Sequence, residues 1–412
     1  MSNIHSLTRP RTLLSLLLIV CLSPLRAQTS EFTASVSALI RIGTIESAEE
    51  QLQQAALWWT QHQEKGQIPL IAGDSVAFLY KGDAHTVKWM GDFNAWGYDK
   101  NVANSGTRIG KTDIWLWRTS FPGDARFDYK IAVDDKDWML DPENPYQQWS
   151  GVGGGSPNSE LRMPAWKEDE VQHERPQISH GSITNDILLH SKVLGYQLMY
   201  SVYIPVHKPA DEPLPVLYVT DGYEYLHPKM GNMVTVLDNL IADHKIVPLA
   251  VIFIDHREPV NRGNNKRMTE LAMNQKYLQF FVDEFLPRME HKYPISRDGS
   301  KRGILGASMG GLNAAFFAFS KPEVFGLVGL QSPAFWTRPQ IYNLCGNPAG
   351  NKVTVSMTSG VINDASEGSR KMKTVFESNA CVYHYREVND GHSWGNWRNL
   401  LDDVLIDLYA PK

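Results

Sequence analysis

The chain has 412 residues, of which 42% are hydrophobic and 21% charged, a balance typical of a soluble globular protein. Its formal net charge of -5 gives no indication of a nucleic-acid partner. The length is too great for one typical core, so we expect two domains.

The N-terminal segment reads as a secretory signal peptide. Two arginines precede an apolar run at residues 13–22, which is too short to span a membrane comfortably. We predict cleavage after Ala27, which removes residues 1–27. We also predict a periplasmic or secreted location, with no stable membrane insertion after cleavage. An uncleaved anchor is the main alternative, and a lipoprotein signal ending at Cys21 is a weaker one.

Two cysteines, Cys345 and Cys381, remain once that segment is removed. In an oxidising compartment they can pair, and two free buried thiols are the alternative. In either case two cysteines are too few to build a fold from disulfides, so an apolar core must carry it.

Residues 28–67 are expected to form a helical arm, because apolar side chains recur at helical spacing between positions 45 and 59. Thr44 stands just before this run and is predicted to be a plain N-cap. The face predicted to be buried consists of Ile45, Ala48, Leu52, Ala55 and Trp59.

Residues 68–166 change to the two-residue period of strands. Short alternating segments are separated by Gly, Asp, Asn and Pro, which is typical of a small antiparallel β-sandwich. These segments are 75–80, 85–90, 114–118 and 127–133. Flat aromatic rings suit sugar rings, but large aromatics usually fill cores, so we favour core packing for the tryptophans of this region. They are Trp96, Trp115 and Trp117.

A charged and polar stretch follows, and we place the linker at 167–190. From 191 to 412, apolar strand-like runs alternate with helical segments, which predicts an α/β sheet with crossover helices, the α/β-hydrolase pattern. The runs at 216–219 and 250–254 are apolar throughout, as expected of strands that are buried on both faces.

The segment Gly306–Gly310 has the pattern Gly-x-Ser-x-Gly. A strand-like run precedes it and a buried helix follows, which is the context of the nucleophile elbow in serine hydrolases. Glycine is needed at both ends because a side chain there would clash with the neighbouring strand or helix. The pattern makes Ser308 the candidate nucleophile, and the first amides of the new helix can stabilise negative charge beside it.

In this fold the acid and then the histidine follow the nucleophile along the chain. His384 falls inside a strand, whereas His392 lies in a turn-rich loop before the last helix and is the predicted base. For the acid we predict Asp364, which follows the preceding strand, with Glu367 as the runner-up and Asp390 as a turn former. A dyad without an acid is the other alternative.

An oxyanion hole needs two backbone amides. One is expected from Met309, the residue after the nucleophile. The other is expected from Tyr223, in the loop after the 216–219 strand, where Gly222 allows a close approach of the backbone.

Further residues of the C-terminal half resemble the enterochelin (enterobactin) esterase and esterase-D-like branch of α/β-hydrolases. The matching segments are Val216–Gly222, Asp255, Arg267–Leu271, Phe285–Pro287, Gly306–Gly311, Lys321–Gly326, Ser332, Gly391–His392 and Trp397–Arg398.

The N-terminal half carries a related likeness. Gly91–Trp96, Tyr129 and Asp141–Pro145 resemble the immunoglobulin-like first domain of enterochelin esterases and the carbohydrate-binding modules of glycogen-branching enzymes and isoamylases. Together the two resemblances imply a two-domain chain, an immunoglobulin-like sandwich followed by an α/β-hydrolase domain. Members of the family often carry a Glu soon after the glycine that matches Gly360, where this chain has Asn363 and Asp364.

The same match makes Arg267 a candidate for binding an anionic catecholate or carboxylate. A surface ion pair with Glu270, one helical turn away, is an equally weighted alternative. Trp394 and Trp397 flank the histidine and either line an aromatic substrate pocket or pack the last helix.

The resemblance implies a serine carboxylic ester hydrolase that acts on a ferric-siderophore trilactone or a related acyl ester. A feruloyl or acetyl esterase acting on plant polysaccharide is the alternative within enzymes. A non-catalytic binding protein on a hydrolase fold is the alternative of another class. The partner is a small-molecule ester, no metal or cofactor takes part in the chemistry, and any iron belongs to the substrate.

Overall fold

The structure is a computed structural model, and its side chains are described from residue 28 onward. The described backbone covers 15–151, 155–206, 212–347 and 352–411. The predicted signal peptide at 1–27 therefore lies outside the described residues, apart from the helical backbone of its last part. Within the described stretches no helix is long and apolar enough to cross a membrane.

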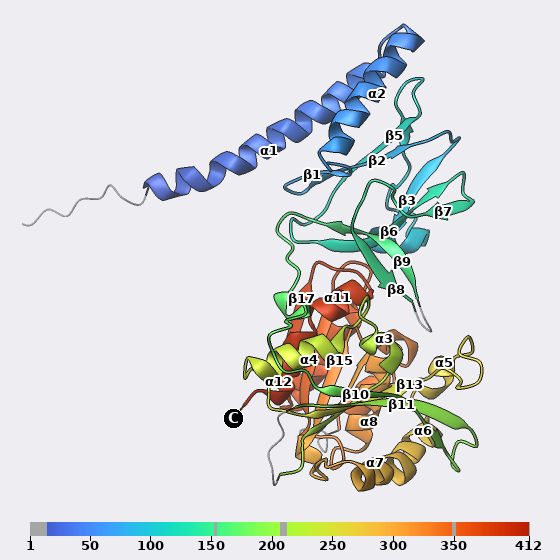
Figure 1. Cartoon of the computed structure of the whole chain (residues 1–412), viewed down its shortest axis with the longest axis vertical. Coiled ribbons are helices and arrows are strands. Elements are labelled where there is room, and N and C mark those ends of the chain that lie inside the picture. Colours follow the sequence, from blue (N-terminus) through green and yellow to red (C-terminus); the bar gives the residue numbers. More distant parts are fainter. Residues whose placement is uncertain (1–14, 152–154, 207–211, 348–351, 412) are drawn as a thin grey trace, which may run out of the picture.

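The helical arm is a hairpin of α1 (Ser15–Ile42) and α2 (Ala48–Glu64) (Figure 1). The N-cap of α2 is Ser47, whose side chain accepts a hydrogen bond from the Glu50 amide, so the predicted N-cap Thr44 is wrong. The predicted apolar face is correct for Ala55 and Trp59, which are buried, but wrong for Leu52, which is 50% exposed, and for Ala48, which is also exposed. The buried residues of α2 are Gln51, Ala55, Trp58, Trp59 and His62.

Polar bonding explains this rotation of α2. The side-chain amide of Gln51 donates to the Ile42 carbonyl and its oxygen accepts from the Lys111 amide. The imidazole Nδ1 of His62 lies 2.7 Å from the Trp58 carbonyl. Because Gln51 and His62 face the interior, Leu52 faces solvent. A prediction built on the spacing of apolar residues alone does not detect buried polar residues.

Two antiparallel sheets make up the strand-rich region that follows. The first has the order β1-β2-β5-β4, and the second has the order β3-β6-β9-β8 with β7 paired to β6. The strands are β1 (Leu70–Ala72), β2 (Ser75–Lys81), β3 (Val87–Gly91), β4 (Thr107–Arg108), β5 (Ile114–Ser120), β6 (Arg126–Val133), β7 (Asp137–Met139), β8 (Gln147–Ser150) and β9 (Ser156–Arg162).

The two sheets share an apolar core between them. Trp115 and Trp117 of β5 pack there against residues of the second sheet, among them Trp89 and Phe127. Core packing, the role predicted for Trp115 and Trp117, is therefore also their observed role. Trp96 differs, because its ring stacks on the half-exposed Trp138 with an interplanar angle of 14°. The immunoglobulin-like character of this region stays a prediction.

The stretch expected to be a linker contains regular structure. It includes a short 3-10 turn, Glu170–Gln172, and its last residues form β10 (Ser182–His190). Strand β10 pairs with β11 at the edge of the large sheet. Nearly all side chains of β10 are exposed, which is consistent with the polar appearance of 167–190, because an edge strand needs few apolar residues.

The C-terminal region is an α/β structure, as predicted. Its sheet has eight strands in the order β10-β11-β13-β12-β14-β15-β16-β17. Pairing is antiparallel between β10, β11 and β13 and parallel from β13 to β17. Beyond β10, the strands are β11 (Gln197–Ile204), β12 (Val216–Val219), β13 (Ala250–Asp255), β14 (Arg302–Ala307), β15 (Leu327–Gln331), β16 (Thr354–Gly360) and β17 (Val382–Val388).

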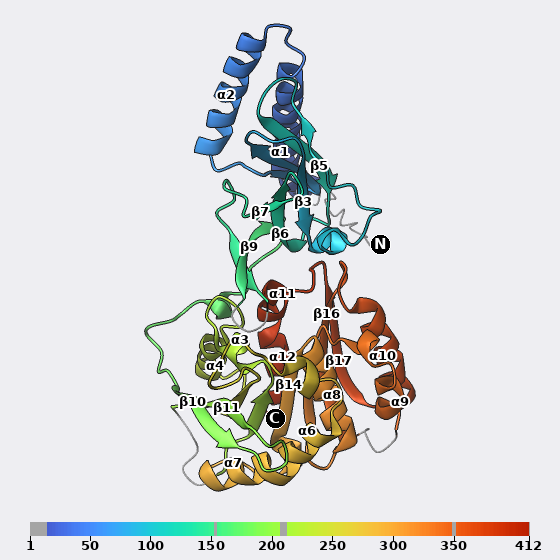
Figure 2. The same ribbon diagram turned by 90° about the vertical axis from the view of Figure 1, so that its right-hand side faces the viewer.

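Helices cover both faces of this sheet (Figure 2), and an apolar core lies on each face. A break at Leu400 divides the single helix predicted at the C-terminus into α11 and α12. The helices are α3 (Gly222–Leu226), α4 (Met233–Ala242), α5 (Arg267–Glu270), α6 (Gln275–Phe280), α7 (Leu286–Lys292), α8 (Met309–Ser320), α9 (Ile341–Cys345), α10 (Ser366–Ser378), α11 (Trp394–Asn399) and α12 (Leu401–Tyr409).

Both cysteines of the α/β region, Cys345 and Cys381, are buried free thiols, so they do not form the disulfide that was left open. Burial raises the pKa of the Cys345 thiol well above its ordinary value, and Cys381 nearby adds to the effect.

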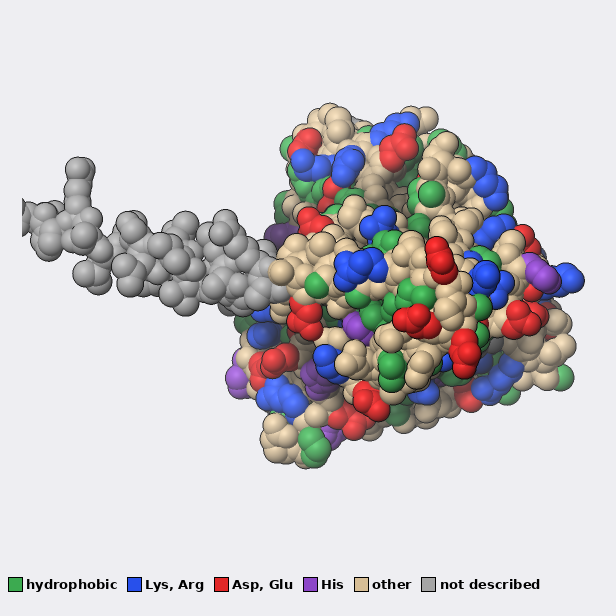
Figure 3. All heavy atoms as spheres, turned by 90° about the horizontal axis from the view of Figure 1, so that it is seen from above, with side chains coloured by type: hydrophobic (Ala, Val, Ile, Leu, Met, Phe, Trp, Pro, Cys, Tyr) green, Lys and Arg blue, Asp and Glu red, His purple; other side chains and the backbone are tan. Residues whose placement is uncertain are grey.

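On the face seen in Figure 3, acidic and basic side chains are interspersed rather than gathered by sign.

The strand-rich region meets the α/β region at the carboxyl ends of the parallel strands (Figure 2). Asn363, which follows β16, donates from its side chain to the Asp92 carbonyl at 3.0 Å. Asn389, which follows β17, accepts at its carbonyl from the Arg126 amide at 3.2 Å. The first region therefore covers the edge of the sheet from which both predicted partners of Ser308 come.

The strand-rich region contains a buried carboxyl, Asp141, and its environment makes stability depend on pH. The Tyr129 hydroxyl donates to Asp141 Oδ2 at 2.7 Å, and the Glu143 amide donates to Oδ1 at 3.0 Å. Burial is the largest effect and raises the pKa of Asp141 to about 6 from 3.8. The protonated form is thus favoured in the folded state, so stability is full below the unfolded pKa and is lost as pH rises through about 6.

We expect Asp141→Asn, which cannot ionise, to be most destabilising at acidic pH. Its deficit against the wild type should shrink by about 2 kcal/mol between pH 4 and pH 7. Urea unfolding at both pH values measures this change, with Asp137→Asn on the exposed strand β7 as the control. Equal deficits at the two pH values would contradict this account.

Candidate active site

Ser308 stands at the sharp turn between β14 and α8. Its backbone has φ 56° and ψ -117°, a conformation that L-residues rarely adopt. The Ser308 amide donates to the Gln331 carbonyl of the next strand at 2.8 Å, which holds the turn.

The two glycines of the pattern are required by space. A Cβ at Gly306 would overlap the backbone of Gly310, and a Cβ on either glycine would overlap Thr220 Oγ1. Thr220 follows the neighbouring strand β12, so the helix can begin this close to the sheet only without those side chains.

A chain of short contacts joins the three residues predicted for the triad. His392 Nε2 lies 2.9 Å from Ser308 Oγ. His392 Nδ1 lies 2.5 Å from Asp364 Oδ1. The imidazole is 29% exposed and the carboxylate is fully buried, so the outer end of the chain is open to a reactant and the inner end is not.

The second carboxylate oxygen of Asp364 accepts three hydrogen bonds. The donors are the Ser332 hydroxyl at 2.6 Å, the Gly360 amide at 2.5 Å and the Asn396 side chain at 3.3 Å. This carboxylate is thus fixed from β15, β16 and α11 together. Ser332 was noted only in the family match, and Asn396 was not predicted at all.

The other acids considered from the sequence lie elsewhere. Glu367 is exposed in the first turn of α10. Asp390, expected to be a turn former, is instead buried, and its backbone forms a β-bridge with that of Arg126 in the strand-rich region. His384 is half-exposed on β17 near Asp407.

The two amides predicted for an oxyanion hole open two short helices. Met309 is the first residue of α8 and Tyr223 the second of α3. Among the described residues neither amide donates to another protein group, as is usual for the first turn of a helix. Gly222 packs on the backbone of β13, where a Cβ would lie 2.6 Å from the Phe253 carbonyl carbon.

Arg267 joins the turns that carry these two amides. Its guanidinium donates to both oxygens of Asp221, at 2.6 and 2.8 Å, and to the Ala307 carbonyl at 3.1 Å. Asp221 precedes Gly222, and Ala307 precedes Ser308. Burial disfavours the charge of Arg267, but Asp221 outweighs it and raises the pKa of the guanidinium above its ordinary value.

The structure therefore corrects the expectation for Arg267. A surface ion pair with Glu270 is not formed, because Glu270 bonds Tyr196 and His256 instead. Arg267 is mostly buried and holds two loops of the protein, rather than standing free for an anionic substrate.

Trp394 and Trp397 are also corrected. Both are buried, at 3% and 7% exposure, and their rings meet edge to face. Trp397 donates to Ser332 Oγ at 2.9 Å, and Trp394 donates to the Gly151 carbonyl at 3.3 Å. They pack the last helices beneath His392 instead of lining a substrate pocket.

The exposed aromatic residue at the site is Trp336, which the sequence reasoning missed. It lies in the 3-10 turn Phe335–Thr337 after β15, is 55% exposed, and its ring centroid is 5.8 Å from that of His392. Its position after the carboxyl end of a parallel strand is the signal that could have found it.

A cavity of about 280 Å³ adjoins the predicted oxyanion loop. Gly222, Tyr223 and His227 line it, together with Arg257, whose guanidinium carbon lies 3.4 Å from the centre of the Tyr223 ring. The site thus has an aromatic and cationic side next to the candidate oxyanion donors.

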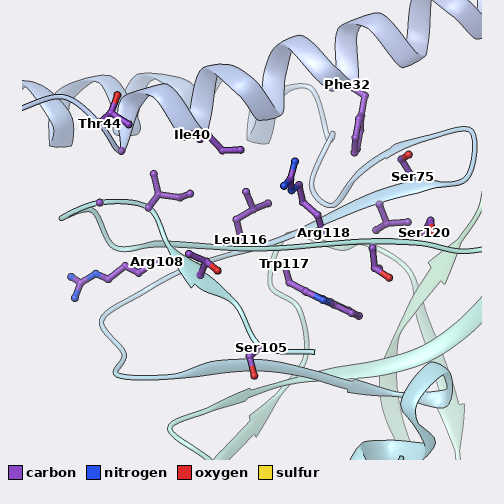
Figure 4. A pocket seen from close by; sticks show the side chains of 16 residues that line it. Phe32, Ile40, Thr44, Ser75, Ser105, Arg108, Leu116, Trp117, Arg118 and Ser120 are labelled. Atoms are coloured by element: carbon purple, nitrogen blue, oxygen red, sulfur yellow. The ribbon is translucent and has the colours of Figure 1, made fainter. Parts of the chain in front are cut away.

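A larger hollow, about 790 Å³, lies far from this chemistry in the sequence and in the fold. Figure 4 shows it between α1 and the first sheet, with Phe32 and Ile40 of the helix facing Leu116 and Arg118 of β5. None of the predicted site residues lines it.

Comparison with known proteins gives the site its context. The sequence matches the profile of the Esterase family over residues 191–408, slightly more than half of the chain. The chain belongs to the Esterase family. It is therefore an ester hydrolase.

Named relatives of this esterase fall into two groups. It is 28% identical over 234 residues to an endo-1,4-beta-xylanase/feruloyl esterase of Xylanibacter ruminicola, covering 55% of this chain and 31% of that protein. It is 24% identical over 338 residues to an iron(III) enterobactin esterase of Escherichia coli O6:H1, covering 74% of this chain and 81% of that protein. The esterase thus spans about a third of the first relative and most of the second.

A solved structure, the ferric enterobactin esterase of Salmonella typhimurium, has the same fold. The TM-score is 0.67 at 20% sequence identity, with 82% of this chain and 94% of that chain covered. The resemblance to enterobactin esterases stated from the sequence is thereby confirmed at the level of family and fold.

We expect Asp364→Asn to lower kcat for ester hydrolysis about 10³–10⁴-fold, because an amide at this position favours the wrong tautomer of the imidazole. Steady-state kinetics on p-nitrophenyl acetate measure the change. Glu367→Gln is the matched control and should stay within about twofold of the wild type. A loss confined to Glu367→Gln would transfer the acid role to that residue.

Proposed function

We propose that this esterase is a serine hydrolase with Ser308 as nucleophile, His392 as general base and Asp364 as the acid that orients it. The observation that carries the proposal is the continuous contact from Asp364 through His392 to Ser308 Oγ, at 2.5 and 2.9 Å. Positioning of this kind is what nucleophilic acyl transfer requires.

The steps follow from the positions of these atoms. His392 Nε2 takes the Ser308 proton as Oγ bonds to the ester carbonyl carbon, and the amides of Met309 and Tyr223 stabilise the oxyanion. The C–O ester bond then breaks, and the proton on His392 leaves with the alcohol. Water, deprotonated by the same histidine, attacks the acyl-enzyme. The bond from the acyl carbon to Ser308 Oγ then breaks, the acid leaves, and the proton on His392 returns to Oγ.

For the substrate we favour an ester that carries an aromatic group, as in a catecholate siderophore trilactone. An exposed tryptophan, Trp336, stands over one side of His392, and Arg257 with Tyr223 stands beside the oxyanion loop. Aromatic faces bind flat rings. Arg257 is mostly buried and paired with Asp255, so it offers no free positive charge to the substrate. The enterobactin esterase relative also aligns with most of this chain.

A feruloyl ester is the second candidate, since it also carries an aromatic group and the relative from Xylanibacter ruminicola is named a feruloyl esterase. We further propose export to the periplasm or beyond, from the apolar run at 13–22. The proposed domain borders are a helical arm at 28–67, a sandwich at 68–166, a linker at 167–190 and the esterase domain at 191–412. The last part of that linker, strand β10, pairs with the esterase sheet.

Wild type and Ser308→Ala should be compared on ferric enterobactin and on methyl ferulate. We expect the wild type to release dihydroxybenzoyl-serine fragments and Ser308→Ala to release none above background. Chromatography of the products measures both reactions. Release of ferulate alone would favour the second candidate, and failure of a fluorophosphonate probe to label Ser308 would favour a non-catalytic binding protein.

The exposed ring of Trp336 gives a separate prediction about the acyl group. Trp336→Ala should raise KM for aromatic acid esters about three- to tenfold, by loss of ring contact, and leave KM for p-nitrophenyl acetate within about twofold. Trp138→Ala, an exposed tryptophan of β7, is the matched control. An equal rise of KM for acetate and aromatic acid esters would refute a role in aromatic recognition.

A further inference from the structure

Arg126 of the strand-rich region forms hydrogen bonds with the loop that carries His392. This loop, residues 389–393, joins β17 to α11. Arg126 begins β6 and has no exposed side-chain surface. Its amide donates to the Asn389 carbonyl at 3.2 Å, and its Nη1 donates to Ser393 Oγ at 2.7 Å. Arg126 therefore bonds the loop on both sides of His392, at Asn389 before it and at Ser393 after it.

Two glycines, one in this loop and one just after it, leave room for side chains of the strand-rich region. A Cβ at Gly395 would overlap the guanidinium of Arg126, and a Cβ at Gly391 would overlap the side chain of Asp92. Asp92 also accepts at its carbonyl from Asn363, the residue before the predicted acid. Contacts from the strand-rich region therefore reach the chain neighbours of both His392 and Asp364.

The guanidinium is fixed on its other side by carboxylates of its own region. Arg126 donates to Asp128 at 2.5 Å and to Glu160 at 2.6 Å. The Ser150 hydroxyl donates to the far oxygen of Asp128 at 2.6 Å. Because two carboxylates fix the orientation of the planar guanidinium through Nε and Nη2, its third nitrogen, Nη1, is directed at Ser393.

Asp390 belongs to the same buried group. It is 3% exposed, and its backbone forms an isolated parallel β-bridge with that of Arg126. One of its carboxylate oxygens has no hydrogen-bond partner in the described part of the chain. Burial raises the pKa of Asp390 well above its ordinary value, against the lowering effect of Arg126. The loop therefore carries a buried acid whose negative charge Arg126 stabilises in part.

We propose that Arg126 is a positioning residue for the catalytic base, which makes the strand-rich region part of the catalytic unit. The inference rests on the proposed function, because it assigns Arg126 a task only if His392 is the base. A general base must stay within hydrogen-bond reach of its nucleophile, and a displacement of about 1 Å can cost about 10²-fold in rate.

A purely structural role for Arg126 makes a different prediction from this one. If the buried charges only join the two regions, loss of any contact in the group lowers stability and leaves kcat of the folded enzyme unchanged. If Arg126 positions the loop, contacts on the loop side change kcat, whereas contacts on the far side of the group do not.

Two hydroxyl deletions separate these cases. Ser393→Ala removes the loop-side acceptor of Arg126, and Ser150→Ala removes a donor on the far side of Asp128. For the full chain on p-nitrophenyl acetate, we expect Ser393→Ala to lower kcat about five- to twentyfold with KM within about twofold. Ser150→Ala should keep both constants within about twofold, while the two variants lose similar amounts of thermal stability.

Arg126→Met is the stronger variant, with a kcat loss of about 100-fold expected, and Arg162→Met, which removes another arginine from Glu160, is its control. If Arg126→Met fails to fold, the serine pair decides. Equal kcat in the two serine variants, with Ser308→Ala inactive, overturns the inference alone. A wild type without Ser308-dependent hydrolysis overturns the proposed function, and the inference falls with it.

Discussion

The turn at Ser308 is the constraint to which the rest of the site is fitted. A serine with positive φ between a buried strand and a buried helix is held only if its surroundings over-determine it. Here the Gln331 carbonyl binds its amide, and Thr220 leaves no room for a side chain at Gly306 or Gly310. The strain directs the hydroxyl out of the sheet, where His392 can reach it.

The site is held in place by polar contacts between distant parts of the chain. Arg267 joins the turn before α3 to the end of β14, and Asp364 is bonded from three different elements. Hydrogen bonds have direction, unlike apolar contacts, so they fix where a side chain points as well as how deeply it lies. This suits a site whose chemistry depends on the relative positions of Ser308 and His392.

The sequence predicted the parts of the fold and site that local pattern controls. Strand, turn and helix around Ser308 follow from local residue types, and chain order then leaves few choices for His392 and Asp364. Arg126 escaped this reasoning because its contact with Ser393 spans 267 positions. Arg267 was noticed through the family match, but neither partner considered for it was Asp221, because Asp221 is near it only in the folded chain.

The unpaired state of Cys345 and Cys381 has a consequence for where this protein can fold. Neither of these buried thiols is part of a covalent crosslink, so the described fold does not depend on an oxidant. The chain without its first residues should reach the same structure in a reducing cytosol as in an oxidising compartment. Production in an ordinary bacterial cytoplasm, with a thiol reductant throughout purification, therefore suits this enzyme.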